Sequence, residues 1–276
     1  MNMSYLKRQV NVGEYELNVY ESGMEQPEVI LFLHGSGPGV TALSNWENTI
    51  TALSDSFHCL APDMLGFADS SHPNPPPLGG DFMQLRVDTL FAMLDSLGLS
   101  KVSIVGNSMG GAIALRMASQ KPERLNRLIL MGTALENPKL TPGLMKVATY
   151  YNDPTVEQLT GLLAEFVYDP SSFGNQLQAI AEARVPCANR EDVRRSHMAS
   201  FAKGAPPLPK VDPNAIIHPA LVIHGVNDKI LEMTEGLKLL QVLPNADAHF
   251  IGQCGHWTQI EHAEKFQNQV RMFMAS

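Results

Sequence analysis

Cysteine is scarce in this sequence. Cys59, Cys187 and Cys254 are the 3 cysteines among 276 residues, and none belongs to a CxxC motif. An odd number cannot pair fully within the chain, so we expect small buried thiols in a reducing compartment. Histidine, cysteine and aspartate are also not grouped at the spacings of metal ligands. The sequence therefore predicts no disulfide framework, no metal and no other cofactor.

Long apolar runs and runs of basic residues are absent as well. No apolar stretch approaches about 18 residues, the length that a membrane helix needs. Residues Met1 to Tyr20 alternate polar and apolar, which is typical of a β-hairpin and not of a signal peptide. We therefore expect a cytoplasmic protein.

The charge balance argues against polyanionic partners. The net charge is −8, and no cluster of Lys or Arg stands out along the chain. Nucleic acid and an anionic membrane surface are thus disfavoured, and we expect a small-molecule substrate and a homo-oligomer of two or more copies. If the substrate is itself an anion, the cation that meets it has to be local.

What the sequence does contain is an alternation of buried strands and helices. The apolar fraction of 44% is that of a globular protein. Buried strands are predicted at Val29–Leu33, His58–Ala61, Val102–Val105, Leu128–Met131, Ala220–Ile223 and Ala248–Ile251. Helical periodicity is found at Trp46–Leu53, Gln84–Leu97, Met109–Gln120, Glu235–Leu243 and Glu261–Phe273. With the hairpin, this predicts an α/β fold with a mostly parallel eight-stranded sheet and helices on both faces.

The alternation is interrupted once. Between about Ala134 and Asp212 there is no buried strand, only helical stretches such as Val156–Tyr168 and Gln176–Arg184. Proline-containing joints, Asn137–Pro138 and Ala205–Pro209, bracket this region. We interpret residues 134–212 as a helical cap inserted after the sixth strand, and residues 1–133 and 213–276 as the core.

The most informative motif is Gly106-Asn107-Ser108-Met109-Gly110, directly after a predicted strand. G-x-S-x-G between a strand and a helix is the nucleophile elbow, in which the glycines allow a very tight turn. The serine then lies at a helix N-terminus, where backbone N–H groups face a developing oxyanion. Ser108 is therefore the candidate nucleophile.

A serine nucleophile needs a histidine base, and the base needs an acid. Asp228 follows the strand that ends in Leu221-Val222-Ile223, and His256 follows the last strand, so they complete the order Ser, Asp, His. The rival acid is Asp63, which also ends a strand but precedes the serine and fits a structural turn better.

The loop after the first buried strand, His34-Gly35-Ser36-Gly37-Pro38-Gly39, is expected to complete the oxyanion hole. We predict that the N–H of Met109 acts with that of Ser36 or Gly37. We expect His34 to orient this loop. The remaining histidines have no partner in a strand-end context, and we assign them no role: His58, His72, His197, His218, His224, His249 and His262.

With these residues, the chain resembles the α/β-hydrolase fold throughout. From about Val29 to Phe273 it resembles the meta-cleavage product hydrolases, which split carbon–carbon bonds in ring-fission products of aromatic catabolism. The resemblance is carried by His34–Gly39 with Ser44-Asn45-Trp46, Asp63–Phe67, Gly106–Gly111 and Cys254-Gly255-His256-Trp257. Ser36 stands where some members have glycine, which a backbone donor tolerates.

The resemblance implies a substrate of the 2-hydroxy-6-oxohexa-2,4-dienoate type, cleaved to 2-hydroxypenta-2,4-dienoate and a carboxylic acid after ketonisation of the dienol. It also implies polar positioning by Asn45 and Asn107 at the carboxylate end, with turn capping as the alternative, and a wall formed by Trp257. The family's cap arginine corresponds to Arg184. Its competitor is Arg190, whose acidic neighbours suggest a helix start on the surface.

Other functions remain open at this point. A carboxylesterase or lactonase would use the same triad, and a haloperoxidase-like activity is a more distant alternative. A ligand-sensing receptor on a degenerate hydrolase fold is an alternative of another class, but it has no need of all of Ser108, Asp228 and His256. The weak match of the cap leaves the acyl group beyond the scissile bond undetermined.

Overall fold

The computed structural model describes residues 5–136 and 138–276. Met1–Ser4, at the start of the predicted hairpin, and Asn137, in the first proline-containing joint, lie outside the described residues. No helix within the described part of the chain is long and apolar enough to cross a membrane.

An eight-stranded sheet forms the centre of the protein, in the order β1-β2-β4-β3-β5-β6-β7-β8. The strands are β1 (Leu6–Val12), β2 (Tyr15–Ser22), β3 (Val29–Leu33), β4 (His58–Pro62), β5 (Val102–Asn107), β6 (Leu125–Met131), β7 (Ala220–Gly225) and β8 (Ala246–Ile251). Strand β2 pairs antiparallel with both neighbours, and all pairs from β4 to β8 are parallel. The predicted mostly parallel sheet is confirmed.

Successive side chains of the central strands point to opposite faces of the sheet and pack into two hydrophobic cores, one on each face. In β3, Ile30 and Phe32 pack with α1 and α10, whereas Leu31 and Leu33 belong to the core beneath α2 and α3. This explains the continuous apolar runs, because both faces of the parallel strands are covered. The helices are α1 (Ala42–Leu53), α2 (Gly79–Ser96), α3 (Met109–Gln120), α8 (Thr234–Val242), α9 (Thr258–Glu261) and α10 (Ala263–Met274).

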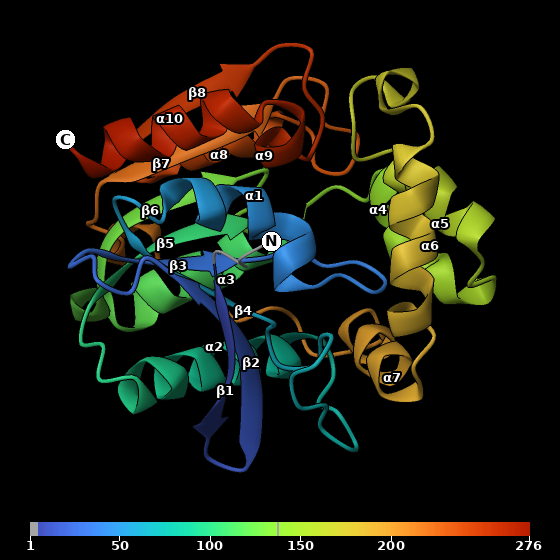
Figure 1. Cartoon of the computed structure of the whole chain (residues 1–276), viewed down its shortest axis with the longest axis horizontal. Helices are drawn as coiled ribbons and strands as arrows, with labels where there is room; N and C mark the ends of the chain where they lie inside the picture. The colour runs from blue at the N-terminus through green and yellow to red at the C-terminus, as the bar shows by residue number, and fades with distance from the viewer. Residues whose placement is uncertain (1–4, 137) are drawn as a thin grey trace.

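Four further helices stand to one side of the sheet (Figure 1). They are α4 (Pro142–Thr149), α5 (Val156–Leu163), α6 (Gln176–Ala188) and α7 (Glu191–Ser200). Apolar residues of α4, α5 and α6 form a cluster with Ile230 and Leu231, after β7, and Trp257, after β8, whereas Ala199 of α7 belongs to the core beneath α2 and α3. The helices therefore lie against the loops that follow the parallel strands, where the predicted site residues are found.

Two predicted helices are shorter or divided. The helix expected at Glu261–Phe273 is interrupted at His262, whose backbone angles (φ −130°, ψ 51°) are not helical. The helix expected at Val156–Tyr168 ends at Leu163. Beyond that point the carbonyl oxygen of Phe166 accepts hydrogen bonds from the backbone N–H groups of His256 and Trp257, at 2.7 and 3.2 Å.

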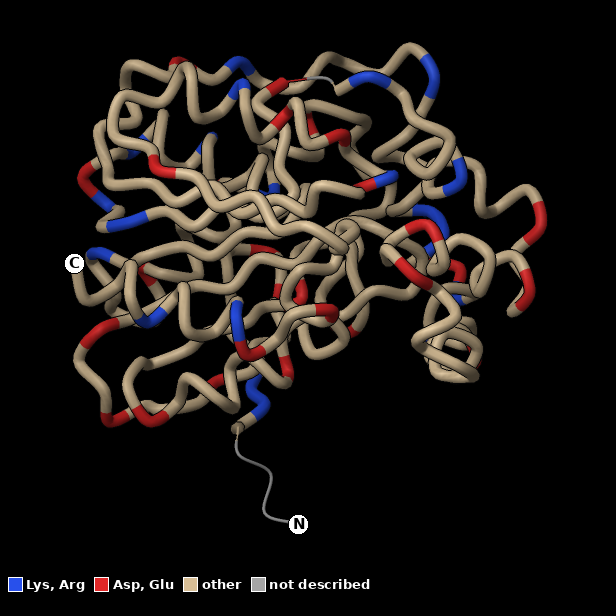
Figure 2. Tube along the Cα trace, turned by 90° about the horizontal axis from the view of Figure 1, so that it is seen from above, with Lys and Arg blue, Asp and Glu red and all other residues tan. Residues whose placement is uncertain are grey.

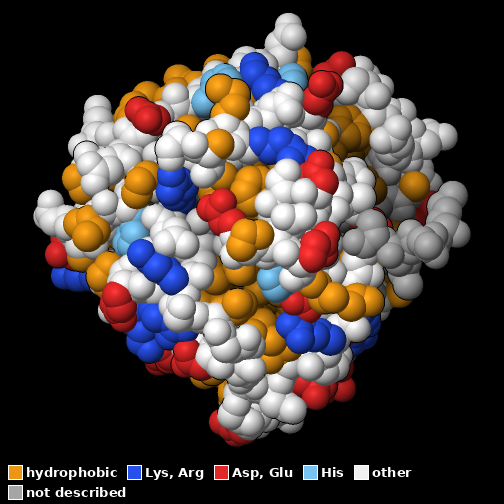
Figure 3. All heavy atoms as spheres, turned by 60° about the vertical axis from the view of Figure 1, so that its left-hand side comes forward, with side chains coloured by type: hydrophobic (Ala, Val, Ile, Leu, Met, Phe, Trp, Pro, Cys, Tyr) orange, Lys and Arg blue, Asp and Glu red, His pale blue; other side chains and the backbone are white. Residues whose placement is uncertain are grey.

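Positively and negatively charged residues are distributed along the whole chain (Figure 2), and they intermingle with apolar side chains on the face shown in Figure 3.

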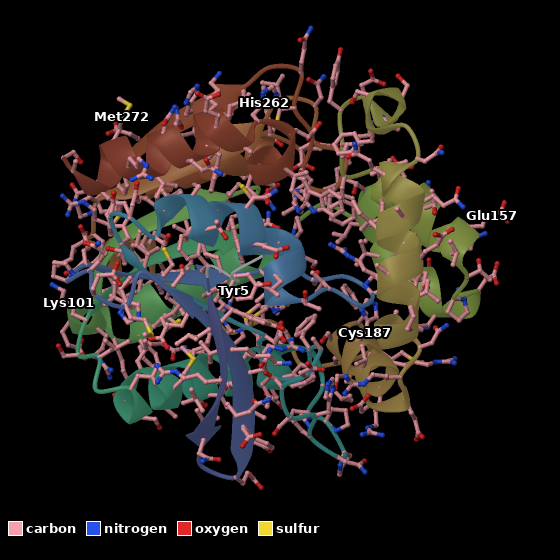
Figure 4. The ribbon with its side chains drawn as sticks, viewed as in Figure 1. Tyr5, Lys101, Glu157, Cys187, His262 and Met272 are labelled. Carbon is pink, nitrogen blue, oxygen red and sulfur yellow. The ribbon has the colours of Figure 1, made fainter. Side chains whose placement is uncertain are left out.

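All three cysteines are free thiols. Cys59 and Cys254 are buried, and Cys187 lies half-buried on α6, near the start of α7 (Figure 4). Burial raises the pKa of the Cys59 and Cys254 thiols to about 12, so neither is a thiolate at neutral pH.

Candidate active site

Ser108 lies on a strained turn between β5 and α3, with φ 54° and ψ −114°. The turn brings backbone segments so close that side chains would not fit beside it. A Cβ on Gly106 would lie 2.6 Å from backbone atoms of Gly110, and a Cβ on Gly110 would lie 2.2 Å from the carbonyl oxygen of Leu33. Glycine at both positions is therefore a requirement of the turn that presents the serine.

His256 and Asp228 form a short hydrogen bond. Nδ1 of His256 lies 2.6 Å from Oδ2 of Asp228, and both side chains are almost completely buried. Gly132 packs against the pair, since a Cβ there would approach the His256 ring to 3.0 Å. Nε2 of His256 is buried and has no hydrogen-bond partner among the described residues, so it is the ring atom free to take up a proton.

Four donors converge on the Asp228 carboxylate. Oδ1 accepts the N–H groups of Ile230 and Leu231 at 2.8 and 2.9 Å. Oδ2 faces His256 and also Nε2 of His224, at 3.3 Å. Burial alone would raise the pKa of Asp228, but the charge of His256 and the hydrogen bonds from both histidines hold it well below its usual range. The acid is thus ionised at any pH at which the protein would work.

The prediction that His224 has no strand-end partner is wrong. It lies in β7, four residues before Asp228, and is completely buried against it. Its Nε2 also lies 2.9 Å from the carbonyl oxygen of Leu231, so this nitrogen faces two acceptors and has to carry the proton. The spacing of four residues at a strand end was the signal that could have revealed this contact.

Asp63, the rival acid, lies elsewhere. Its carboxylate accepts the N–H of Ala42, at the start of α1, at 2.6 Å and the side-chain amide of Asn18 at 2.7 Å. It is completely buried, and burial raises its pKa to about 6. Asp63 therefore joins β2 to the N-terminus of α1, and His256 is hydrogen-bonded to Asp228 instead.

The loop after β3 passes directly over the elbow. Gly35 is so close that a Cβ would lie 2.8 Å from Oδ1 of Asn107. Nε2 of His34 accepts the N–H of Met64 at 3.1 Å, so its Nδ1 donates to the carbonyl oxygen of Gly35 at 2.8 Å. Burial lowers the pKa of His34 to about 4, which keeps it neutral in this orienting position.

The backbone donors expected to form the oxyanion hole lie around this loop. Met109 is the first residue of α3, so its N–H has no acceptor within the helix. Ser36 lines two neighbouring cavities, and Gly37 lines one of them.

Two cavities meet at Ser36 and form lobes of one site. The small lobe is narrow and includes Asn45, Asn107, Arg184, His256 and Trp257. The large lobe has a volume of about 260 Å³ and includes Ser108 together with a mostly apolar wall. The base thus lines the small lobe, where the polar groups gather among apolar side chains, and the nucleophile lines the large lobe.

Arg184 is the buried cation of the small lobe. Its side chain, on α6, lies over the Trp257 ring at 5.3 Å, and the residue is 8% exposed. Burial lowers its pKa to about 10, and no carboxylate of the described residues lies within ion-pair distance. Arg190 is different: it precedes α7, is exposed, and pairs with Asp192 and Asp69 at 2.7 and 3.3 Å.

Asn45 and Asn107 are hydrogen-bonded to each other, with Nδ2 of Asn45 donating to Oδ1 of Asn107 at 3.3 Å. Neither caps α1, whose N-cap is Thr41. Both are buried at the wall of the small lobe. No three His, Cys, Asp or Glu side chains in residues 5–136 and 138–276 are placed so as to hold a metal ion.

Sequence reasoning missed two charged residues of the large lobe, the exposed Glu136 and the buried Arg86 on α2. Arg86 is the one that packing holds in place. Arg86 follows Phe82 by four residues and Met83 by three, so it lies on the buried face of its helix. An arginine at an apolar position of an amphipathic helix was the available signal.

Comparison with known proteins agrees with this architecture. Residues 28–263 match the family model described as the alpha/beta hydrolase fold. The chain is 37% identical to a 2-hydroxymuconate semialdehyde hydrolase of a Pseudomonas species, over 99% of this chain and 95% of that one. It is 36% identical to a 2-hydroxy-6-oxononadienedioate/2-hydroxy-6-oxononatrienedioate hydrolase of Burkholderia vietnamiensis, over 98% and 96%.

Solved structures give the same result. The 2-hydroxy-6-oxo-6-phenylhexa-2,4-dienoate hydrolase of a Rhodococcus species superposes with a TM-score of 0.90 at 29% identity, covering 99% of both chains. A meta-cleavage product hydrolase of Pseudomonas fluorescens gives 0.89 at 30% identity, again covering 99% of both chains. The chain belongs to the α/β-hydrolase fold family and, within it, to the meta-cleavage product hydrolases.

Proposed function

We propose that this enzyme hydrolyses a carbon–carbon bond in a ring-fission product of the 2-hydroxy-6-oxohexa-2,4-dienoate type. The products are 2-hydroxypenta-2,4-dienoate and a carboxylic acid. The observation that carries the proposal is a buried guanidinium, Arg184, which has no carboxylate partner among the described residues and lines the same lobe as His256, the partner of Asp228. An ester hydrolase needs only the nucleophile, base and oxyanion donors, whereas an anionic dienoate also needs a fixed cation.

The chemistry sets two tasks. Breaking the bond between C5 and C6 leaves an electron pair on C5, which is acceptable only if a carbonyl group can take it up. The proton of the C2 hydroxyl is therefore first moved to C5, which gives a C2 ketone conjugated with the C3–C4 double bond. After attack on the C6 ketone, the bond breaks and its electrons pass to the C2 oxygen, which is reprotonated. The net change is the addition of one water molecule.

We assign the residues accordingly. Ser108 attacks C6, and after the C5–C6 bond breaks a water molecule hydrolyses the resulting acyl-serine ester, which frees the serine and the carboxylic acid. His256 transfers the protons in both steps, and Asp228 holds the imidazole in the tautomer that Nε2 requires. The oxyanion formed at C6 is bound by backbone N–H groups of Met109 and of Ser36 or Gly37.

At the other end of the dienoate, Arg184 binds the carboxylate or the 2-oxo group. The amides of Asn45 and Asn107 position the same end, and Trp257 forms the wall against which the guanidinium rests. We further propose that residues 134–212 act as the cap that closes this site, on a core of residues 1–133 and 213–276.

Loss of colour tests the function directly. Ring-fission dienoates are yellow, and cleavage shortens the conjugated system by removing the C6 carbonyl from it, so purified protein should bleach them with release of the acid. Hydrolysis of simple esters or lactones without bleaching would favour an esterase or lactonase. Binding without turnover of either would favour a sensor.

A cytoplasmic location and assembly as a homo-oligomer remain part of the proposal. Cell fractionation and sedimentation velocity would test them separately.

A further inference from the structure

Arg86 is a second buried guanidinium of the site, in the lobe that Arg184 does not line. It lines the large lobe, which Ser108 also lines, and is 1% exposed. Its planar group lies 3.8 Å from the centroid of the Phe82 ring. The aromatic face and the cavity wall thus hold a cation at a fixed place beyond the nucleophile.

The hydrogen bonds of Arg86 use only some of its N–H donors. Nε donates to the carbonyl oxygen of Leu65 at 3.0 Å, and one terminal nitrogen donates to Oγ of Ser200 at 3.1 Å. The other terminal nitrogen has only the sulfur of Met109, at 3.9 Å, a weak acceptor. A guanidinium has five N–H donors, and only two of them meet oxygen in the described structure.

No carboxylate neutralises this charge within the described residues. None lies within ion-pair distance, and burial lowers the pKa of Arg86 to about 9, which leaves it charged at neutral pH. The one carboxylate on the wall of the lobe, Glu136, is exposed. A buried cation without a counter-ion is costly unless a ligand supplies the anion.

We propose that the large lobe takes the acyl part of the substrate and that Arg86 binds a carboxylate at its far end. This inference rests on the proposed function and narrows it: the preferred substrates are dioates, with one carboxylate at Arg184 and the other at Arg86. The apolar wall, which includes Met83, Leu144 and Leu208, contacts the methylene groups between the scissile ketone and the second carboxylate.

The size of the lobe agrees with an acyl chain of several atoms. About 260 Å³ would be left almost empty by an aldehyde substrate, whose acyl part is a single hydrogen beyond the carbonyl carbon. Of the two curated relatives described above, the Burkholderia vietnamiensis enzyme is named for a dioate. The charge of the lobe, and not its volume, distinguishes a carboxylate from an apolar group of the same length.

Two substrates of equal length test the inference: 2-hydroxy-6-oxonona-2,4-dienedioate, and the same dienoate ending in a methyl group. We expect wild-type kcat/KM for the dioate to be greater by roughly ten- to a hundredfold, the effect of hydrogen bonds to a charged group. Arg86→Met should abolish this preference, mainly through loss on the dioate. Arg86→Lys should retain part of it, since it keeps the charge but loses the planar pair of donors.

Arg116→Met is the matched control. Arg116 is equally buried, on α3, but does not line either lobe, so its loss should leave the ratio between the two substrates unchanged. The inference is wrong if wild type cleaves both substrates equally well, or if Arg86→Met and Arg86→Lys slow both substrates alike. Arg86 would then have only a structural role, in joining α2 to its neighbours. Failure to bleach either dienoate would instead reject the proposed function. The wild-type ratio decides the question even if Arg86→Met does not fold.

Discussion

Arg184→Gln separates carbon–carbon bond cleavage from the chemistry of the triad. In the proposed complex, a desolvated guanidinium meets an anionic dienoate, and loss of one partner of a buried ion pair costs about 3 to 5 kcal/mol. At 1.36 kcal/mol per factor of ten, kcat/KM for a dienoate should fall by roughly two to four powers of ten. The same substitution should also slow ketonisation, because the 2-oxo group forms at the Arg184 end.

A neutral ester provides the reference reaction. p-Nitrophenyl acetate uses the serine, the base and the oxyanion donors but has no anionic end, so its hydrolysis should be far less affected. The assay is stopped-flow absorbance of the dienoate beside steady-state ester hydrolysis with the same preparation of each variant.

Stability gives a second check. Arg184 has no carboxylate partner among the described residues, so the free protein should not lose unfolding free energy when the charge is removed. Arg190→Gln is the control: it removes exposed ion pairs worth about 0 to 1 kcal/mol and should leave both reactions unchanged. Equal losses on dienoate and ester in Arg184→Gln, or a larger dienoate loss in Arg190→Gln, would refute the assignment.

Two other substitutions test the catalytic machinery. Ser108→Ala should reduce turnover of ester and dienoate by about 10⁴ to 10⁶ without unfolding the protein, and near-normal activity would exclude the serine from the mechanism. His224→Leu removes one of four donors to Asp228; both reactions should slow together, by about tenfold, with KM unchanged. His224→Gln, which keeps an amide donor, should recover part of the rate; equal rates for wild type and His224→Leu would remove any positioning role.

The sequence predicted most of what depends on local pattern. The buried strands were recognisable because both faces of a parallel sheet are covered, which makes the strands continuously apolar. The elbow was recognisable because its glycines cannot be replaced: a Cβ on Gly110 would lie only 2.2 Å from a backbone oxygen. Asp228 and His256 could be placed because parallel strands bring their carboxyl ends to one edge. Strand ends were the least certain, as β5 and β7 each extend two residues further than predicted.

What the sequence could not supply is which buried charges have partners. Arg86 and Arg184 lie on helices, and Arg190 directly precedes one. Only the packing shows that Arg86 and Arg184 line cavities, whereas Arg190 pairs with carboxylates. His224 looked like one of several ordinary histidines, because its role depends on how the turn after β7 folds Asp228 back toward it. Such contacts arise from tertiary packing and leave little trace in periodicity.

The two candidate acids differ in a way that pH can reveal. Burial raises the pKa of Asp63 to about 6 from 3.8. Between these values the folded protein holds a proton that the unfolded chain releases, so Asp63 stabilises the fold fully at low pH and this contribution is lost as pH rises through about 6. The difference between the two pKa values corresponds to about 3 kcal/mol of unfolding free energy. Buried His34 and His197, with pKa values lowered to about 4, act in the opposite direction over a similar range.

A difference curve isolates the carboxyl group. We expect the unfolding free energy of Asp63→Asn, relative to wild type, to rise by up to about 3 kcal/mol between about pH 4 and pH 7, measured by urea denaturation at each pH. Altered hydrogen bonds to Ala42 and Asn18 would shift this curve by a constant without changing its slope. Turnover should remain close to that of wild type, whereas Asp228→Asn should lose several powers of ten. A flat difference curve would show that Asp63 does not titrate in this range. A loss of turnover in folded Asp63→Asn as large as that of Asp228→Asn would overturn the assignment of Asp228 as the acid, an assignment based on its hydrogen bond to Nδ1 of His256.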